Sequence, residues 1–141
     1  MRSLLLLALL AGTPRVALEV RLVVPCSSHD AGKPVKDPDA ASSVCLDRTP
    51  FLTDRDVESA EVRRSGSGRV VIFLTFHSDA AMRELQVTLK NVGNRVGIVL
   101  NGNLVSAPRI SGGSRFLFID GGFTRAQAEA MVSALNAQAR R

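Results

Sequence analysis

The chain has 141 residues, a length typical of one domain, and 45% of them are hydrophobic, which is enough to bury a core. Charged residues make up 22% of the sequence, so intrinsic disorder is not expected. The sequence has no Trp, no Tyr and only six Phe, which argues against a sugar-binding cradle or an aromatic platform for stacking bases.

The first 17 residues have the layout of a secretory signal peptide. Arg2 makes the start of the chain positive, residues 4–11 (LLLLALLA) form an apolar run, and residues 12–14 break a helix. The run is too short to span a bilayer, which takes about 20 apolar residues. A buried N-terminal helix is the alternative. Ala17 is a small residue suited to the cleavage point, although Arg15 fits position −3 poorly, and Thr13 is the other candidate.

Cleavage after Ala17 leaves 124 of the 141 residues and, by removing Arg2 and Arg15, lowers the formal net charge from +5 to +3. This small charge does not provide the clustered positive surface that nucleic acids require. No later segment approaches the length of a transmembrane helix. We therefore expect an exported protein, periplasmic or secreted, that does not span the membrane after signal cleavage and has no nucleic-acid partner.

Two cysteines, Cys26 and Cys45, enclose a polar loop. In an oxidising compartment such a pair predicts a disulfide, which would stabilise the loop by about 3 kcal/mol. A metal site that uses Cys26 and His29 is the competing interpretation, but two ligands fall short of the four that structural zinc needs. The sequence therefore predicts a disulfide and no metal site.

The first half of the predicted domain consists of strands followed by a helix. Apolar and polar residues alternate over 18–24, which indicates a half-buried strand. Residues 57–64 and 69–76 are two further strands around a Gly–Ser turn, and the second is apolar on both faces, as in the middle of a sheet. Ser78 is expected to cap a helix, and Gly93 to end it. The apolar stripe of this helix is expected to face the core and consists of Met82, Leu85, Leu89 and Val92.

The second half begins with a hairpin. Strands at 95–100 and 103–110 flank Asn101-Gly102, a pair that favours a type I′ turn. Pro108 cannot donate to a sheet ladder, so the second strand is expected to lie at a sheet edge or to leave the sheet there. Residues 115–119 form a strand with Phe116 and Phe118 on one face, ended at Gly121. The last helix starts at a capping box of Thr124 and Gln127, and its apolar stripe consists of Ala128, Met131, Val132 and Leu135. The pattern predicts an α+β fold with two layers: a mostly antiparallel sheet with two helices packed on one face.

From residue 51 to residue 138, short motifs follow one another in an order found in a known family. They are Leu52-Thr53, Asp56-Val57, Ala60, Asn91-Val92-Gly93, Ile98-Val99-Leu100, Gly102, Val105-Ser106-Ala107-Pro108, Ile110, Gly113, Ile119, Gly121, Phe123-Thr124, Ala128 and Leu135. In this order they resemble the head of the first periplasmic domain of SecD, a subunit of the bacterial SecD–SecF protein-export complex. The resemblance divides the chain into a signal peptide at 1–17, a first strand with a disulfide-tied loop at 18–50, and a SecD-head-like domain at 51–138.

Several features depart from that family. SecD is a membrane protein whose proton-coupling acids lie in its membrane part, so no residue here inherits that role. Gln127 stands where the family more often has Glu, Gly97 stands where it often has Ala, and the connection from Ile110 to Arg115 looks shorter than usual. The loop between the two cysteines has no recognised counterpart. The chain therefore resembles a free-standing, exported copy of the head.

The candidate binding segment is Val105, Ser106, Ala107 and Pro108, where small side chains beside an edge proline leave room for an extended peptide. The alternative is that these residues only end a strand. Gly93, Asn101, Gly102 and Gly121 are expected to be structural turns. The acidic residues lack the spacing of a calcium loop, and no catalytic motif is present, so we expect no catalytic residues, no cofactor and no small-molecule substrate.

The resemblance implies a non-enzymatic module that assists protein export. Its partners would be unfolded or translocating polypeptide, and possibly the membrane subunits of the translocase. The alternative is a structural or adaptor protein of the cell envelope that kept the fold without a role in export.

Overall fold

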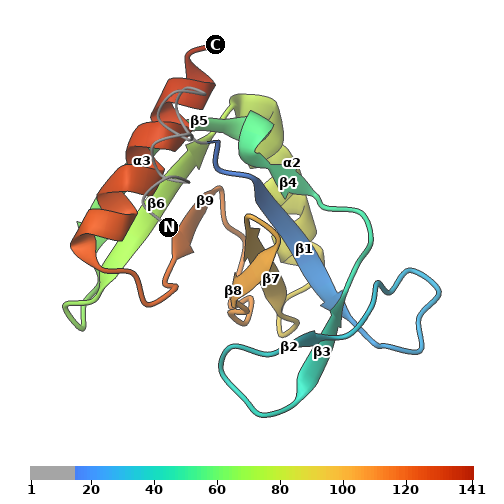
Figure 1. Cartoon of the computed structure of the whole chain (residues 1–141). Helices are drawn as coiled ribbons and strands as arrows, with labels where there is room; N and C mark the ends of the chain where they lie inside the picture. Colours follow the sequence, from blue (N-terminus) through green and yellow to red (C-terminus); the bar gives the residue numbers. More distant parts are fainter. Residues whose placement is uncertain (1–14) are drawn as a thin grey trace.

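The computed structural model describes residues 15–141, so the predicted signal peptide lies, apart from its last three residues, outside the described residues. The predicted α+β class is confirmed, with antiparallel pairing in every strand pair (Figure 1). The strands do not form the one sheet that we expected but divide between two sheets.

The larger sheet has six strands in the order β2-β3-β1-β7-β8, with β4 paired to β1. Their bounds are β1 Leu18–Val24, β2 Val35–Lys36, β3 Ser43–Leu46, β4 Leu52–Thr53, β7 Val96–Leu100 and β8 Asn103–Ser106. The smaller sheet has the order β5-β6-β9, with β5 at Val57–Arg64, β6 at Val70–Phe76 and β9 at Phe116–Ile119. Strand β6 is thus central in its sheet, as its two apolar faces predict.

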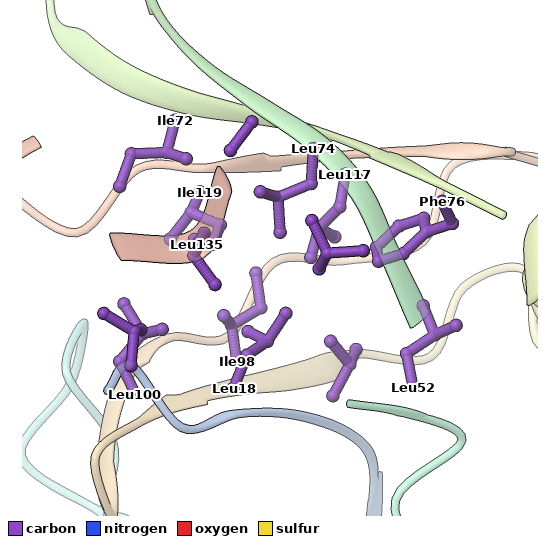
Figure 2. Packing of buried hydrophobic residues seen from close by; sticks show 14 of the residues in the cluster. Leu18, Leu52, Ile72, Leu74, Phe76, Ile98, Leu100, Leu117, Ile119 and Leu135 are labelled. Carbon is purple, nitrogen blue, oxygen red and sulfur yellow. The ribbon is translucent and has the colours of Figure 1, made fainter. Parts of the chain in front are cut away.

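The helices are α2 at Ser78–Lys90 and α3 at Arg125–Ala139, and a short 3-10 helix, η1, spans Asp54–Asp56. Both helices contribute to one core between the two sheets. Figure 2 shows this core, in which Ile72 and Leu74 of the smaller sheet face Leu18 and Ile98 of the larger one. Leu135 of α3 lies within the same cluster and is 1% exposed.

The orientation of α2 contradicts the sequence prediction. Ala80, Glu84 and Thr88 are buried, whereas Met82 and Leu89 of the predicted stripe are 45% and 59% exposed. Val92, just past the helix, is also exposed and Leu85 is half-buried, so the stripe does not face the core. The spacing of apolar residues indicates which face of a helix is apolar, but it does not determine which face packs against the rest of the protein. The inward face of the helix therefore consists of Ala80, Glu84 and Thr88, and the large apolar side chains of the predicted stripe lie outside it.

The caps and turns depend on local chemistry and mostly agree with prediction. The capping box of α3 is confirmed, because the Thr124 hydroxyl accepts from the Gln127 N–H at 3.1 Å and the Gln127 side chain accepts from the Thr124 N–H at 2.9 Å. The N-cap of α2 is His77 and not Ser78, which is the first helical residue. His77 has an extended backbone and makes no side-chain cap bond.

The predicted disulfide is confirmed, with the Cα atoms of Cys26 and Cys45 5.2 Å apart. The loop that it closes contains β2 and β3, two short strands that no periodic pattern predicts. Cys45 itself is buried and pairs with Val24 of β1. The disulfide therefore holds a small antiparallel extension of the larger sheet in place.

Gly97, one of the departures from the SecD pattern, permits close packing between β3 and β7. A Cβ atom at this position would lie 2.6 Å from Cδ2 of Leu46 and 3.2 Å from Cδ1 of Leu104. Both leucine side chains lie over the glycine on the outer face of the larger sheet, so an alanine there would need Leu46 to move.

No helix within residues 15–141 combines the length and the apolar character that crossing a membrane requires.

Candidate functional site

The predicted binding segment, Val105 to Pro108, begins in β8 and continues past its end. Strand β8 stops at Ser106 and does not reach Ile110 as predicted, but it lies at the edge of the larger sheet, as the proline indicates. Val105 and Ser106 are half-buried and Pro108 is exposed. Ala107 is only 3% exposed, so its side chain cannot contact a partner directly.

The turn that carries β8 has the backbone that its sequence favours. Asn101 and Gly102 have φ angles of 50° and 83°, and both values lie in the left-handed region that a type I′ turn needs. Leu100 and Asn103 close this two-residue turn as a hydrogen-bonded pair, so the next pair, Val99 and Leu104, is not hydrogen bonded across the strands. The N–H and C=O of Leu104 therefore point away from β7, towards the open edge.

Side chains occupy part of the other strand edges near the core. Asn136 of α3 accepts from the Ala60 N–H at 2.8 Å and donates to the Ala60 carbonyl at 2.9 Å, which caps β5 at this residue. The Ser114 hydroxyl accepts from the Phe116 N–H at 3.2 Å and donates to the Phe116 carbonyl at 2.7 Å, which closes the start of β9. Within residues 15–141, no bond from outside the ladder closes Asn103–Ser106 of β8. The β8 edge is thus open to a further strand.

Beyond β8, the segment is anchored by Arg95. Its Nε atom donates to the Ala107 carbonyl at 2.8 Å, and the Val96 N–H donates to the Pro108 carbonyl at 3.0 Å. These bonds hold the backbone in place although Pro108 has no N–H to contribute to the sheet. These hydrogen bonds therefore hold the backbone of the segment in place without a bound partner.

The disulfide-tied loop supports the same anchor. The two carboxylate oxygens of Asp37 accept from Arg95 at 2.8 and 3.1 Å, and Asp37 is 3% exposed. The hydrogen bond from Arg95 is the main cause that holds the pKa of Asp37 below its ordinary value of 3.8. The loop thus contacts the binding segment through one arginine, an arrangement that sequence reasoning missed because the two residues lie far apart in the chain.

Two of the predicted structural turns beyond the β7–β8 hairpin differ in what makes them glycine. Gly93 has a φ of 91° three residues after the end of α2, a value that favours glycine. At Gly121 the φ angle is not positive, and it is Gly122 that has a φ of 70°. Gly121 instead leaves room for the ring of Phe123, since a Cβ atom there would lie 2.6 Å from the ring Cζ.

Three of the six phenylalanines lie together on the outer face of the smaller sheet. The ring of Phe73 lies 5.4 Å from that of Phe116 and 4.8 Å from that of Phe118, measured between centroids. The guanidinium of Arg63 lies 3.8 Å from the Phe73 ring centroid. Phe116 and Phe118 share one face, as predicted, and each is about half exposed.

A buried carboxyl group is the main feature that sequence reasoning missed. Glu84 of α2 is 3% exposed, and burial raises its pKa to about 8. The only signal in the sequence is its spacing, four residues after Ala80 and four before Thr88, which places it on their face of the helix. Within residues 15–141, no three His, Cys, Asp or Glu side chains gather as metal ligands would.

The comparisons with known proteins agree with this fold and its motifs. Residues 31–139 match the family model of the SecDF P1 head subdomain, so the match begins inside the disulfide-tied loop. The protein translocase subunit SecD of Acidaminococcus fermentans is 30% identical over 55% of this chain and 21% of its own length. The protein translocase subunit SecDF of Thermus thermophilus is 38% identical over 43% of this chain and 8% of its own length.

A solved structure of a membrane component SecDF that enhances protein export shares the fold. It superposes with a TM-score of 0.71 and 23% identity, covering 97% of this chain and 69% of the solved chain. SecDF in its super-membrane-facing form gives the same TM-score over 21% of that chain. This chain thus spans about a fifth of the length of the curated SecD relative. Because the family match covers most of the sequence, the chain belongs to the SecDF P1 head subdomain family.

Proposed function

We propose that this protein is an exported, non-enzymatic binding module that assists protein export by transient contact with translocating polypeptide or with translocase subunits. It would act in the periplasm or outside the cell, after removal of the signal peptide. Membership of the SecDF P1 head family supports a role related to export, because the solved SecDF is a membrane component that enhances protein export.

The open edge of β8 is the observation that carries the proposal. An extended polypeptide can add to an unpaired strand edge through backbone hydrogen bonds, which do not depend on its sequence. This suits a module that meets many different exported chains. The binding segment is Val105 to Pro108 together with the outward-facing backbone of Leu104. Ala107 has a buried side chain and a carbonyl that accepts from Arg95, so it contributes by holding the segment in place.

Site-specific photocrosslinking tests this proposal. A photoreactive phenylalanine analogue is placed at exposed Asn103 or Pro108, and at exposed Glu58 on the closed edge strand β5 as a control. The probe is a reduced and carboxymethylated polypeptide, which cannot fold. We expect crosslinks from Asn103 and Pro108 that exceed those from Glu58 severalfold. Equal yields at all three positions would remove the β8 edge as the contact.

The adaptor alternative draws on the exposed side of α2. Met82, Leu89 and Val92 are each about half exposed, and exposed apolar groups that lie together are typical of protein interfaces. An adaptor would use such a surface for one stable partner. Pull-down from a periplasmic extract distinguishes the two functions, because an export module should recover many exported chains or translocase subunits and an adaptor should recover one envelope protein.

A further inference from the structure

Glu84 has a buried oxygen that makes no hydrogen bond. Its Oε1 atom has no donor within residues 15–141, although the residue is 3% exposed. A buried acceptor without a donor is costly to the fold, so native proteins seldom leave one unpaired. The group therefore points to a donor that arrives from outside the chain.

The polar neighbours of Glu84 are already engaged elsewhere. The Thr88 hydroxyl donates to the Glu84 carbonyl at 2.8 Å and accepts from the Ser114 N–H at 2.9 Å. The Arg109 guanidinium, at the same cavity, donates through Nη1 to the Gly93 carbonyl at 2.5 Å. Neither side chain bonds the Glu84 carboxyl group.

Glu84 lines a cavity of about 140 Å³ that opens to solvent. Its other walls include apolar side chains from both sheets, from the residue before β4 and from the connection before β9, namely Val20, Phe51, Val96, Ile110 and Leu117. An apolar cavity of about 150 Å³ in another protein accommodates benzene, which has six heavy atoms. A chain of four methylene groups with one polar end, five heavy atoms in all, is of similar size.

We propose that this cavity binds a primary ammonium group on an unbranched alkyl stem, with the Glu84 carboxylate as its counter-ion. An ammonium has three donors and no acceptor, which matches the unpaired Oε1. The methylene stem packs against the apolar walls. Lysine side chains of a polypeptide and free alkylamines both carry this chemistry. The site is separate from the β8 edge, so it does not rest on the function proposed above.

Binding of the cation requires the ionised carboxylate. Because burial raises the pKa of Glu84 to about 8, the group is mostly protonated at pH 6 and must lose its proton when the ammonium binds. Affinity therefore rises with pH up to about 8. Besides Glu84, the one charged side chain lining the cavity is Arg109, whose positive charge opposes the ligand. The substitution Arg109→Gln should tighten binding.

The test uses the full chain and n-butylammonium, followed by NMR titration of the cavity methyl groups. We expect saturable shifts at Ile110 and Leu117, with an affinity at least about tenfold higher at pH 8 than at pH 6. Glu84→Gln, which keeps the size and removes the charge, should weaken binding at least about tenfold at pH 8. An unchanged spectrum away from the cavity verifies that this variant is folded.

Two comparison ligands complete the experiment. Neutral n-butanol has the same stem, and its binding should be at least about tenfold weaker at pH 8. N-acetyl-lysine amide identifies the source of the ligand, because equal affinity for it indicates a polypeptide side chain and exclusion indicates a free amine. Equal binding of n-butanol and n-butylammonium, or undiminished binding to Glu84→Gln, would overturn the site. Either result leaves the crosslinking test of the β8 edge unaffected.

Discussion

Replacing Glu84 by Gln should change how the stability of the protein depends on pH. The folded state binds the proton of Glu84 more tightly than the unfolded chain, because burial raises the pKa from its ordinary value of 4.5 to about 8. The free energy of unfolding that this group contributes is therefore greatest below pH 4.5, and it falls as the pH rises towards 8. Gln has no proton to lose, so Glu84→Gln should remove this fall.

The magnitude follows from the pKa difference. The interval from 4.5 to about 8, at about 1.4 kcal/mol for each pH unit, sets an upper limit of about 5 kcal/mol. The cavity beside Glu84 opens to solvent, and water in it makes ionisation less unfavourable. We therefore expect the free energy of unfolding of the unsubstituted protein, relative to Glu84→Gln, to fall by about 2 kcal/mol between pH 5 and pH 8.

Urea denaturation at four pH values from 5 to 8 measures this difference. The control is Glu58→Gln, which removes a carboxyl group that is exposed on β5 and should leave the pH dependence unchanged. Effects of other titrating groups cancel because each variant is compared with the unsubstituted protein at the same pH. If the stabilities of Glu84→Gln and the unsubstituted protein run parallel across this range, the reasoning about the buried carboxyl group is refuted.

Three further predictions concern the rest of the chain. Replacing Cys26 and Cys45 by Ser should lower the free energy of unfolding by about 3 kcal/mol in urea denaturation, because the disulfide closes a loop between residues 19 apart. Gly97→Ala should lower it by about 1–3 kcal/mol in the same assay, because the new methyl group would overlap a leucine side chain of β3. Under the export function proposed above, the intact mass of the mature protein should place its first residue at or before Val16, because Val16 is 5% exposed within the core and cleavage after Ala17 would remove it.

Each of these predictions has its own control. The reduced form of the unsubstituted protein should match the double Ser variant, and a large gap between them would mean that the substitutions themselves destabilise the fold. Gly66→Ala places a methyl group in open space, so it should be nearly neutral, and equal losses at Gly66 and Gly97 would contradict the packing argument. A mature protein that starts at Leu18 would show that Val16 is dispensable.

The hairpin turn at Asn101-Gly102, the cap of α3 and the longer strands could be predicted because short-range chemistry determines them. The turn at Asn101-Gly102 depends only on the φ angles of these two residues. The capping box at Thr124 depends only on a partner three residues later in the chain. The bounds of β5, Val57–Arg64, agree with the predicted strand for the same reason. The motif order also identified the family, since the match covers residues 31–139.

Long-range choices could not be predicted from the sequence. Strand β1 pairs with β7, which lies more than 70 residues later, and this pairing separates two sheets where one was expected. Which face of α2 is buried depends on how the helix packs against the rest of the fold. In this structure Ala80 and Thr88 are buried, and the larger Met82 and Leu89 are exposed. No short sequence pattern determines which distant strands pair or which face of a helix is buried.

The candidate site could be predicted only in outline. Pro108 predicts a strand that lies at a sheet edge or leaves the sheet there, and β8 is an edge strand that ends at Ser106. Whether an edge is open depends on distant side chains: Asn136 caps β5 at Ala60, while no such group bonds Asn103–Ser106 of β8 within residues 15–141. The anchoring of the segment through Arg95 and Asp37 joins residues 58 positions apart, which a single sequence does not reveal.

Amide hydrogen exchange at β8 tests the central claim most directly. The Leu104 N–H faces the open edge, so it should exchange quickly in the free protein and several times more slowly when a reduced and carboxymethylated polypeptide is bound. The Ala60 N–H on β5, which Asn136 already occupies, should show no change. Slower exchange at Leu104 alone is the result that we predict. Unchanged exchange at Leu104 under conditions where the polypeptide is bound would contradict strand addition at this edge.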